Sequence, residues 1–163
     1  MNDSSAYYRL GGELSLSNLG QLELLRGVVE RGHSFRTCVR GWSMAPFIRD
    51  QDVLTIAPLT GKPLRLGSVV AFVQPDAGRL AIHRLIARQG DRWLIRGDNN
   101  PEADGIIPSE NILGYVIRVE RNGRSIRLGL GPGALLIVGL QRVHLLRRLI
   151  LLAWHLRQRL KRY

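Results

Sequence analysis

Between Gly41 and about Leu128, the chain alternates short β-like runs with turn residues, and this alternation limits its possible folds more than any other feature. The runs are DVLTIA (52–57), SVVAFV (68–73), RLAIHRLIA (79–87), RWLIR (92–96), ILGYVIRVE (112–120) and RSIRL (124–128). The segments between them are rich in Gly, Asp, Asn and Pro, which readily adopt turn conformations. Asn122-Gly123 between two such runs indicates a hairpin. The pattern predicts a mainly β domain, either a compact barrel or a sandwich.

A helix is predicted just before this β-rich region. Ser17 is a suitable N-cap for a helix over residues 18–31, and Gly32 is a natural stop. The apolar stripe of this helix consists of Leu22, Leu25, Val28 and Val29. We expect residues 1–16 to be a loose lead-in, and residues 33–40 to form a strand that ends at Gly41.

A second helix is predicted at the other end of the chain. After the glycine-rich hinge GLGPG (129–133), apolar residues recur three or four apart from Leu140 to Tyr163, as in an amphipathic helix. The chain therefore divides into an N-terminal lead-in and helix (1–33), a β-rich domain (34–128), and a hinge with a basic amphipathic helix (129–163).

The net charge of +11 belongs almost entirely to the C-terminal segment. Residues 121–163 contain nine Arg and one Lys but no Asp or Glu, so the other 120 residues carry 14 basic and 13 acidic side chains, a net charge of +1. Because these cations are interleaved with Leu and Ile, residues 140–163 indicate a helix on an anionic membrane surface. The alternative is a helix that packs on its own domain or on a partner protein. Without a recognition motif, nucleic acid is not an expected partner.

Three further features limit the location and chemistry of the protein. Residues 1–16 lack the basic and apolar regions of a cleavable signal peptide, and no window has the ~18 uninterrupted apolar residues of a clear membrane span. We therefore expect a cytoplasmic or peripheral membrane protein. The only cysteine, Cys38, has no partner for an internal disulfide. No cofactor or metal is expected, because His33, His144 and His155 lack ligand partners at useful spacing.

Four motifs contain residue types that can take part in catalysis. In chain order they are GWSMAPFIRDQD (41–52), LGSVVAF (66–72), IHR (82–84) and RGDNNPEAD (96–104). Taken together, they resemble the signal peptidase I superfamily over about residues 36–120. The most similar branch is that of archaea, spore-forming bacteria and the endoplasmic reticulum, in which histidine replaces lysine as the base. The matching positions are Ser43, Met44, Pro46, Asp52, the strand Gly67–Phe72, His83-Arg84, Gly97–Asn100 and Asp104.

The resemblance implies the coiled β-barrel of signal peptidases and repressor proteases, with Ser43 as nucleophile and His83 as base. A serine hydroxyl needs such a base at neutral pH. The chain has only two lysines, and neither lies in the strand where a lysine base is expected. Histidine works best when a carboxylate fixes its tautomer, and Asp98 and Asp104 are both candidates. The implied activity is cleavage of a leader or signal segment after small residues of a precursor, with Ser43 and Met44 at the oxyanion and substrate-binding position.

One departure from the family pattern concerns the oxyanion site. Many relatives carry a small polar residue two positions before the nucleophile, where this chain has Gly41, and Trp42 replaces the usual small residue. Loss of one oxyanion donor costs about 10²–10³ in turnover. Two alternatives therefore remain open, a self-cleaving repressor-like regulator and a catalytically weak binding module of the same fold.

Overall fold

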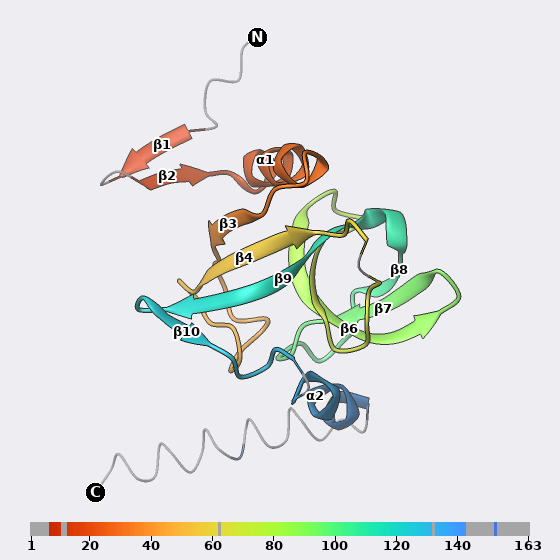
Figure 1. Ribbon diagram of the computed structural model, residues 1–163. Helices are drawn as coiled ribbons and strands as arrows, with labels where there is room; N and C mark the ends of the chain where they lie inside the picture. Colours follow the sequence, from red (N-terminus) through yellow and green to blue (C-terminus); the bar gives the residue numbers. More distant parts are fainter. Residues whose placement is uncertain (1–6, 11–12, 62, 132, 143–151, 153–163) are drawn as a thin grey trace, which may run out of the picture.

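The computed structural model describes residues 7–10, 13–61, 63–131, 133–142 and 152 (Figure 1). Its elements follow in the order β1 (Tyr7–Leu10), β2 (Glu13–Leu16), α1 (Asn18–Glu30), β3 (Phe35–Cys38), β4 (Val53–Pro58), β5 (Val69–Val73), β6 (Leu80–Gln89), β7 (Arg92–Arg96), β8 (Gly105–Pro108), the 3₁₀ turn η1 (Ser109–Asn111), β9 (Ile112–Arg121), β10 (Arg124–Ile126) and α2 (Gly133–Arg142). The mainly β architecture with an N-terminal and a C-terminal helix is confirmed.

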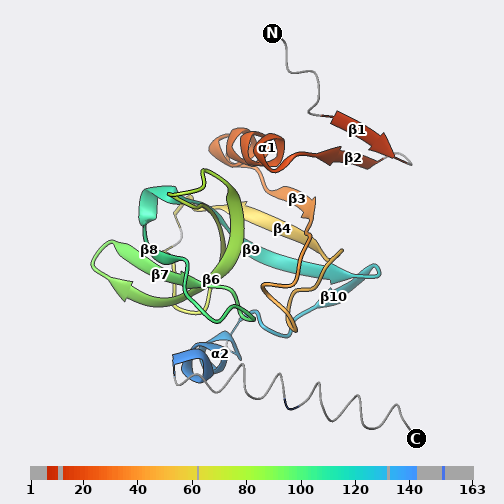
Figure 2. The same cartoon turned by 180° about the vertical axis from the view of Figure 1, so that it is seen from behind.

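Eight strands form one antiparallel sheet in the order β3-β4-β9-β5-β6-β7-β8, and β10 pairs with β9. The sheet curls on itself, with α1 lying beside β3 and β4 and α2 at the opposite end, as the two views in Figures 1 and 2 show. The β9–β10 turn has positive φ at both Asn122 (50°) and Gly123 (74°), as a two-residue hairpin requires. The hairpin predicted there is confirmed.

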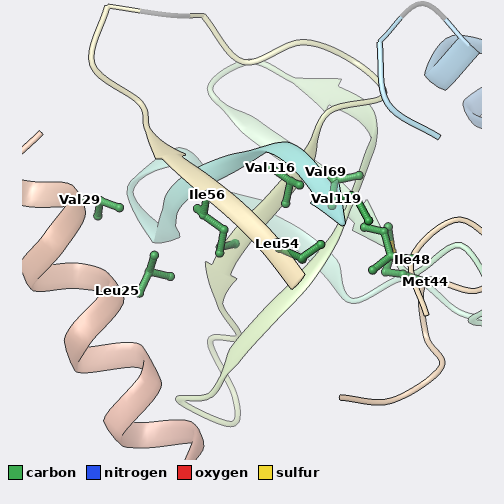
Figure 3. Packing of buried hydrophobic residues seen from close by; sticks show 10 residues of the cluster. Leu25, Val29, Met44, Ile48, Leu54, Ile56, Val69, Val116 and Val119 are labelled. Carbon is green, nitrogen blue, oxygen red and sulfur yellow. The ribbon is translucent and has the colours of Figure 1, made fainter. Parts of the chain in front are cut away.

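Alternation along the strands builds two apolar cores. One core lies between α1 and the strands β4, β5 and β9 (Figure 3), and it contains Leu25, Val29, Met44, Ile48, Leu54, Ile56, Val69, Ala71, Val116 and Val119. The second core is formed by β5 to β9 and contains Val70, Phe72, Leu85, Trp93, Ile95, Ile107 and Ile112. Because β5 is buried on both faces, it contributes side chains to both cores.

Helix α1 begins and ends close to the predicted bounds. The side chain of Ser17 accepts a hydrogen bond from the backbone N–H of Gly20 (3.2 Å), which makes Ser17 the N-cap as predicted. Leu22, Leu25 and Val29 are buried. The chain leaves the helix at Gly32, where φ is +78°, a conformation that favours glycine.

The N-terminal lead-in is more ordered than the sequence prediction allowed. Residues 7–10 pair with residues 13–16 in an antiparallel hairpin, so the expectation of a loose lead-in is wrong over this part. Gly11-Gly12 between two short runs is itself a hairpin signal. Strand β8 was also not predicted. It has only four residues, Gly105–Pro108, and these are too few to show an alternation of apolar and polar side chains.

The predicted C-terminal helix lies mostly outside the described residues. Helix α2 begins at Gly133, before the predicted start at Leu140, and Ala134, Ile137, Val138 and Gln141 form its buried face. None of the helices that the structure describes is long and apolar enough to cross a membrane.

A crowded glycine on β9 provides a test of the register between β4 and β9. A Cβ atom on Gly114 would lie 2.5 Å from the carbonyl oxygen of Ala57 and 2.8 Å from Cγ2 of Ile56. Overpacking of this kind costs about 1–3 kcal/mol, so Gly114→Ala should lower the free energy of unfolding, measured in urea, by that amount. The matched control is Gly139→Ala, because no atom lies within 4 Å of the added Cβ. The control should be neutral or slightly stabilising, since alanine favours a helix over glycine. Equal stability of both variants would contradict this register.

Candidate active site

His83 lies between a serine and a carboxylate. It is on β6, paired in register with Val70 of β5, and only 6% exposed. Its Nε2 lies 2.9 Å from Oγ of Ser43, and its Nδ1 lies 2.7 Å from Oδ2 of Asp104. With the ring proton on Nδ1, that nitrogen donates to Asp104 and Nε2 is left to accept the serine proton. The three side chains thus form a continuous hydrogen-bonded chain suited to nucleophilic catalysis.

Two contacts hold Asp104 in place. Its other carboxylate oxygen, Oδ1, accepts a hydrogen bond from Nε2 of Gln74 (3.2 Å). Its backbone N–H donates to the carbonyl oxygen of Ile95 (2.9 Å). Gln74 was missed by sequence reasoning, because it follows β5 in an ordinary turn and carries no signal that separates it from other turn residues.

Ser43 lies in the compact turn that joins β3 to β4. On one side of it, the backbone N–H of Gly41 donates to Oδ1 of Asp50 (2.8 Å), and Gly41 has a φ of +99°. On the other side, Met44 and Ile48 are each 4% exposed and pack into the first core. Met44 and Ile48 therefore fix the turn to the barrel, and Ser43 lies at the surface of the barrel beside His83.

The GDNN segment (97–100) contacts the turn that carries Ser43. The backbone N–H of Asn99 donates to the carbonyl oxygen of Ser43 (2.7 Å), and its side chain donates to the carbonyl oxygen of Trp42 (3.3 Å). A Cβ atom on Gly97 would lie 2.7 Å from the same Ser43 oxygen. Glycine at position 97 is therefore required for this close approach.

Asp98 lies away from His83 and is paired with Arg84. Its two carboxylate oxygens accept hydrogen bonds from Nε (2.7 Å) and NH2 (2.6 Å) of Arg84, and both side chains are completely buried. Nε2 of Gln141 on α2 donates to the same carboxylate (2.6 Å). Of the two acids left open by the sequence, only Asp104 contacts His83. The role of Gln141 could not be read from the sequence, since the residue lies in a separate helix.

A second, partly buried ion pair supports the turn that carries Ser43 from its far end. Asp52 is 1% exposed and accepts hydrogen bonds from Nε (2.8 Å) and NH2 (2.6 Å) of Arg121 and from the backbone N–H of Arg49 (2.8 Å). Burial alone would raise the pKa of Asp52. The hydrogen bonds from Arg121 and Arg49, together with their positive charges, outweigh that effect and hold the pKa of Asp52 below its usual value.

The backbone N–H groups around Ser43 differ in their hydrogen bonding. The N–H of Gly41 is engaged by Asp50, whereas none of the hydrogen bonds described for the chain uses the backbone N–H of Ser43. Trp42 is 62% exposed beside it. The residue directly before Ser43 therefore presents a large exposed ring, and Gly41, two positions before Ser43, has no side-chain hydroxyl.

A cavity of about 370 Å³ adjoins the Ser43–His83 pair. It is lined by residues 37–41, at the end of β3 and directly after it, and by residues 80–83, the first part of β6. Its floor is apolar and includes Met44, Ile48 and Leu54, and Asn18 and Gln21 of α1 also line it. Within the described part of the chain, no group of three His, Cys, Asp or Glu side chains could hold a metal ion.

The comparison with protein families agrees with this arrangement. The family model described as Peptidase S24-like matches residues 10–117, and the chain belongs to this family. Membership indicates a serine peptidase, and the matched region contains Ser43, His83, Asp98 and Asp104. A search of curated proteins found no match.

The pair between Asp52 and Arg121 predicts a defined acid sensitivity. Because the pKa of Asp52 is lowered in the folded state, its contribution to stability is complete above the unfolded-state value of about 4 and is lost as the pH falls through the folded-state value. Asp52→Asn should therefore be less stable than the wild type at pH 7, and the difference should shrink below about pH 4. Urea denaturation from pH 7 to pH 2.5 measures it. A difference that does not change with pH would contradict the assignment. The control is Asp76→Asn, because the Asp76 side chain is exposed.

Proposed function

We propose that this protein is a serine endopeptidase of the signal peptidase I type, from the branch that uses histidine as base. It would cleave a leader or signal segment from a protein or peptide precursor. The observation that carries the proposal is the hydrogen-bonded chain from Ser43 Oγ through the His83 ring to Asp104. Neither of the two lysines of the sequence, Lys62 and Lys161, lies in the run RLAIHRLIA (79–87), where His83 occupies the position expected for the base.

In the proposed mechanism, Oγ of Ser43 attacks the carbonyl carbon of the scissile peptide bond and its proton passes to Nε2 of His83. The negative charge of Asp104 stabilises the imidazolium that results. The imidazolium then gives this proton to the leaving amine, the peptide C–N bond breaks, and an acyl-enzyme on Ser43 remains. Water attacks the acyl-enzyme while His83 takes its proton, and the released serine regains a proton from His83. The backbone N–H of Ser43 is the proposed oxyanion donor, with the adjacent Met44 at the substrate-binding position.

The cavity beside Ser43 is suited to an extended peptide. Strand β6 pairs with β5 along residues 80–84, but its pairing with β7 begins only at Arg84. In an antiparallel ladder, alternate residues turn their N–H and C=O groups to opposite sides. The edge of β6 that faces away from β5, just before His83, can therefore pair with a substrate strand, a common mode of peptide recognition.

The remaining parts of the proposal rest on the sequence. Cleavage after small residues follows from the family resemblance. Association with an anionic membrane surface through residues 140–163, in a cytoplasmic or peripheral membrane protein, stays a prediction because most of that segment lies outside the described residues. Self-cleavage as a repressor-like regulator and binding without catalysis stay the alternatives, and an intact-mass measurement of the purified chain over time distinguishes self-cleavage from cleavage of another chain.

Loss of the nucleophile or of the base should abolish the activity. We expect purified protein to cleave candidate precursor peptides, and Ser43→Ala and His83→Ala to lower the rate by at least about 10³-fold. Matched controls are Ser125→Ala and His33→Ala, since both side chains are exposed and lie outside the proposed site. Mass spectrometry of the products provides the rate. If the Ser43 and His83 variants cleave as fast as the parent, the proposed mechanism is wrong.

The two acids of residues 96–104, Asp98 and Asp104, should have separable effects. Asp104→Asn should lower kcat by about 10⁴-fold, because the ring then favours the wrong tautomer, and should change the free energy of unfolding by only about 1 kcal/mol. Asp98→Asn should lower the free energy of unfolding by about 3–5 kcal/mol, because it leaves the buried Arg84 charge unpaired. Urea denaturation and peptide cleavage, run on both variants, measure the two quantities. The reverse pattern would identify Asp98 as the acid that acts on His83.

A further inference from the structure

Helix α1 contributes a side chain that takes the place of a substrate backbone at one end of the cavity beside Ser43, which we call the cleft. The side-chain amide of Asn18 forms two hydrogen bonds with the main chain of Leu80: Nδ2 donates to the carbonyl oxygen (3.0 Å), and Oδ1 accepts from the N–H (2.9 Å). A strand residue opposite Leu80 would use the same two groups in the same donor and acceptor roles. Asn18 therefore satisfies this position of the β6 edge and closes it to a peptide.

We propose that Asn18 determines how many substrate residues the cleft accepts, limiting pairing along β6 to about three residues from the scissile bond. Leu80 lies three positions before His83, which corresponds to about 10 Å of strand. In an antiparallel ladder, alternate residues turn their N–H and C=O groups to opposite sides. Between Leu80 and His83, Ile82 is therefore the residue whose N–H and C=O groups face away from β5 and remain available. A peptide whose scissile bond lies at Ser43 can pair with the backbone of Ile82, and the next such position, Leu80, is occupied by Asn18.

The position of Asn18 is set by a firmly seated helix. It follows the N-cap Ser17 directly, and the buried stripe of Leu22, Leu25 and Val29 fixes α1 against the barrel. One turn further along, Gln21 lines the same cavity. The end of the cleft is thus formed by helical residues packed on the core, and a longer peptide would have to displace the Asn18 amide to continue along β6.

This inference rests on the proposed function, and it assigns the closed end of the cleft to the acyl half of the substrate. That half stays bound to Ser43 in the acyl-enzyme, and the preference for small residues before the cleaved bond, which the resemblance implies, requires a pocket on that side. Asn18 acts here as a specificity-determining residue and takes no part in the chemistry.

The test uses N-acetyl-oligoalanine boronic acids of one to six residues and direct measurement of Kd by calorimetry. In such a complex, Oγ of Ser43 adds to the trigonal boron, its proton passes to His83, and a tetrahedral boronate forms reversibly. For the wild type, Kd should fall as the peptide grows to about three residues, and then change less than about twofold per added residue. For Asn18→Ala, the fourth and fifth residues should together lower Kd a further threefold to tenfold, the gain expected for one or two new backbone hydrogen bonds.

Two further variants separate this role from simple anchoring of the helix. Glu23→Ala removes an exposed side chain of α1 and should keep the wild-type dependence on length. Asn18→Asp keeps the acceptor for the Leu80 N–H but loses the donor, so it should give an intermediate dependence, and circular dichroism verifies that each variant is folded. If the two hydrogen bonds only anchored α1, Asn18→Ala would weaken binding of all lengths equally.

The outcomes are distinct. A plateau at about three residues in the wild type that moves to longer peptides in Asn18→Ala supports the proposal. A wild-type affinity that rises steadily to six residues, or the same plateau in Asn18→Ala, overturns it and leaves the peptidase assignment intact. If no boronic acid of any length binds at Ser43, the proposed function itself is wrong, and this inference fails with it.

Discussion

The buried ion pair between Arg84 and Asp98 is the interaction on which the geometry of the site depends. Successive residues of a strand point to opposite faces, so Arg84 enters the interior of the barrel while its neighbour His83 faces the cleft. Arg84 holds Asp98 through two hydrogen bonds. Asp98 lies in the GDNN segment, and the backbone N–H of the next residue, Asn99, donates to the Ser43 carbonyl oxygen. One ion pair thereby fixes the strand of the proposed base, the segment of the acid, and the turn of the nucleophile relative to one another.

A buried ion pair is costly to desolvate, and it is tolerated only when further hydrogen bonds satisfy its remaining polar atoms. NH1 of Arg84 donates to the carbonyl oxygens of Gly67 and Gly129 (2.8 Å each), and Gln141 donates to Asp98. These partners come from the turn before β5, the segment after β10, and α2. Helix α2 therefore contributes a donor to the polar network behind the site, and the glycine-rich segment before α2 is tied to the barrel at Gly129.

The strand pattern, the cap of α1 and the pairing of Ser43 with His83 could be predicted from the sequence, because each depends on local residue types or on ordered motifs. The choice between Asp98 and Asp104 could not, since both acids stand in one segment and only the fold determines which one meets Arg84. Gln74, Gln141 and Asn18 were missed for the same reason: each acts through a contact with a distant part of the chain. The β1–β2 hairpin was missed although Gly11-Gly12 carries a signal for it.

The proposed use of histidine as base makes its orientation the main requirement at this site. A lysine must be desolvated before it can accept a serine proton near neutral pH, whereas histidine titrates there without such help. His83 can therefore stand beside a cavity of about 370 Å³, provided that its tautomer and direction are fixed. Asp104 fixes both, and Gln74 and the Ile95 carbonyl in turn fix Asp104. The proposed chemistry depends on these hydrogen bonds, whereas the proposed role of Asn18 on α1 concerns the length of the bound peptide.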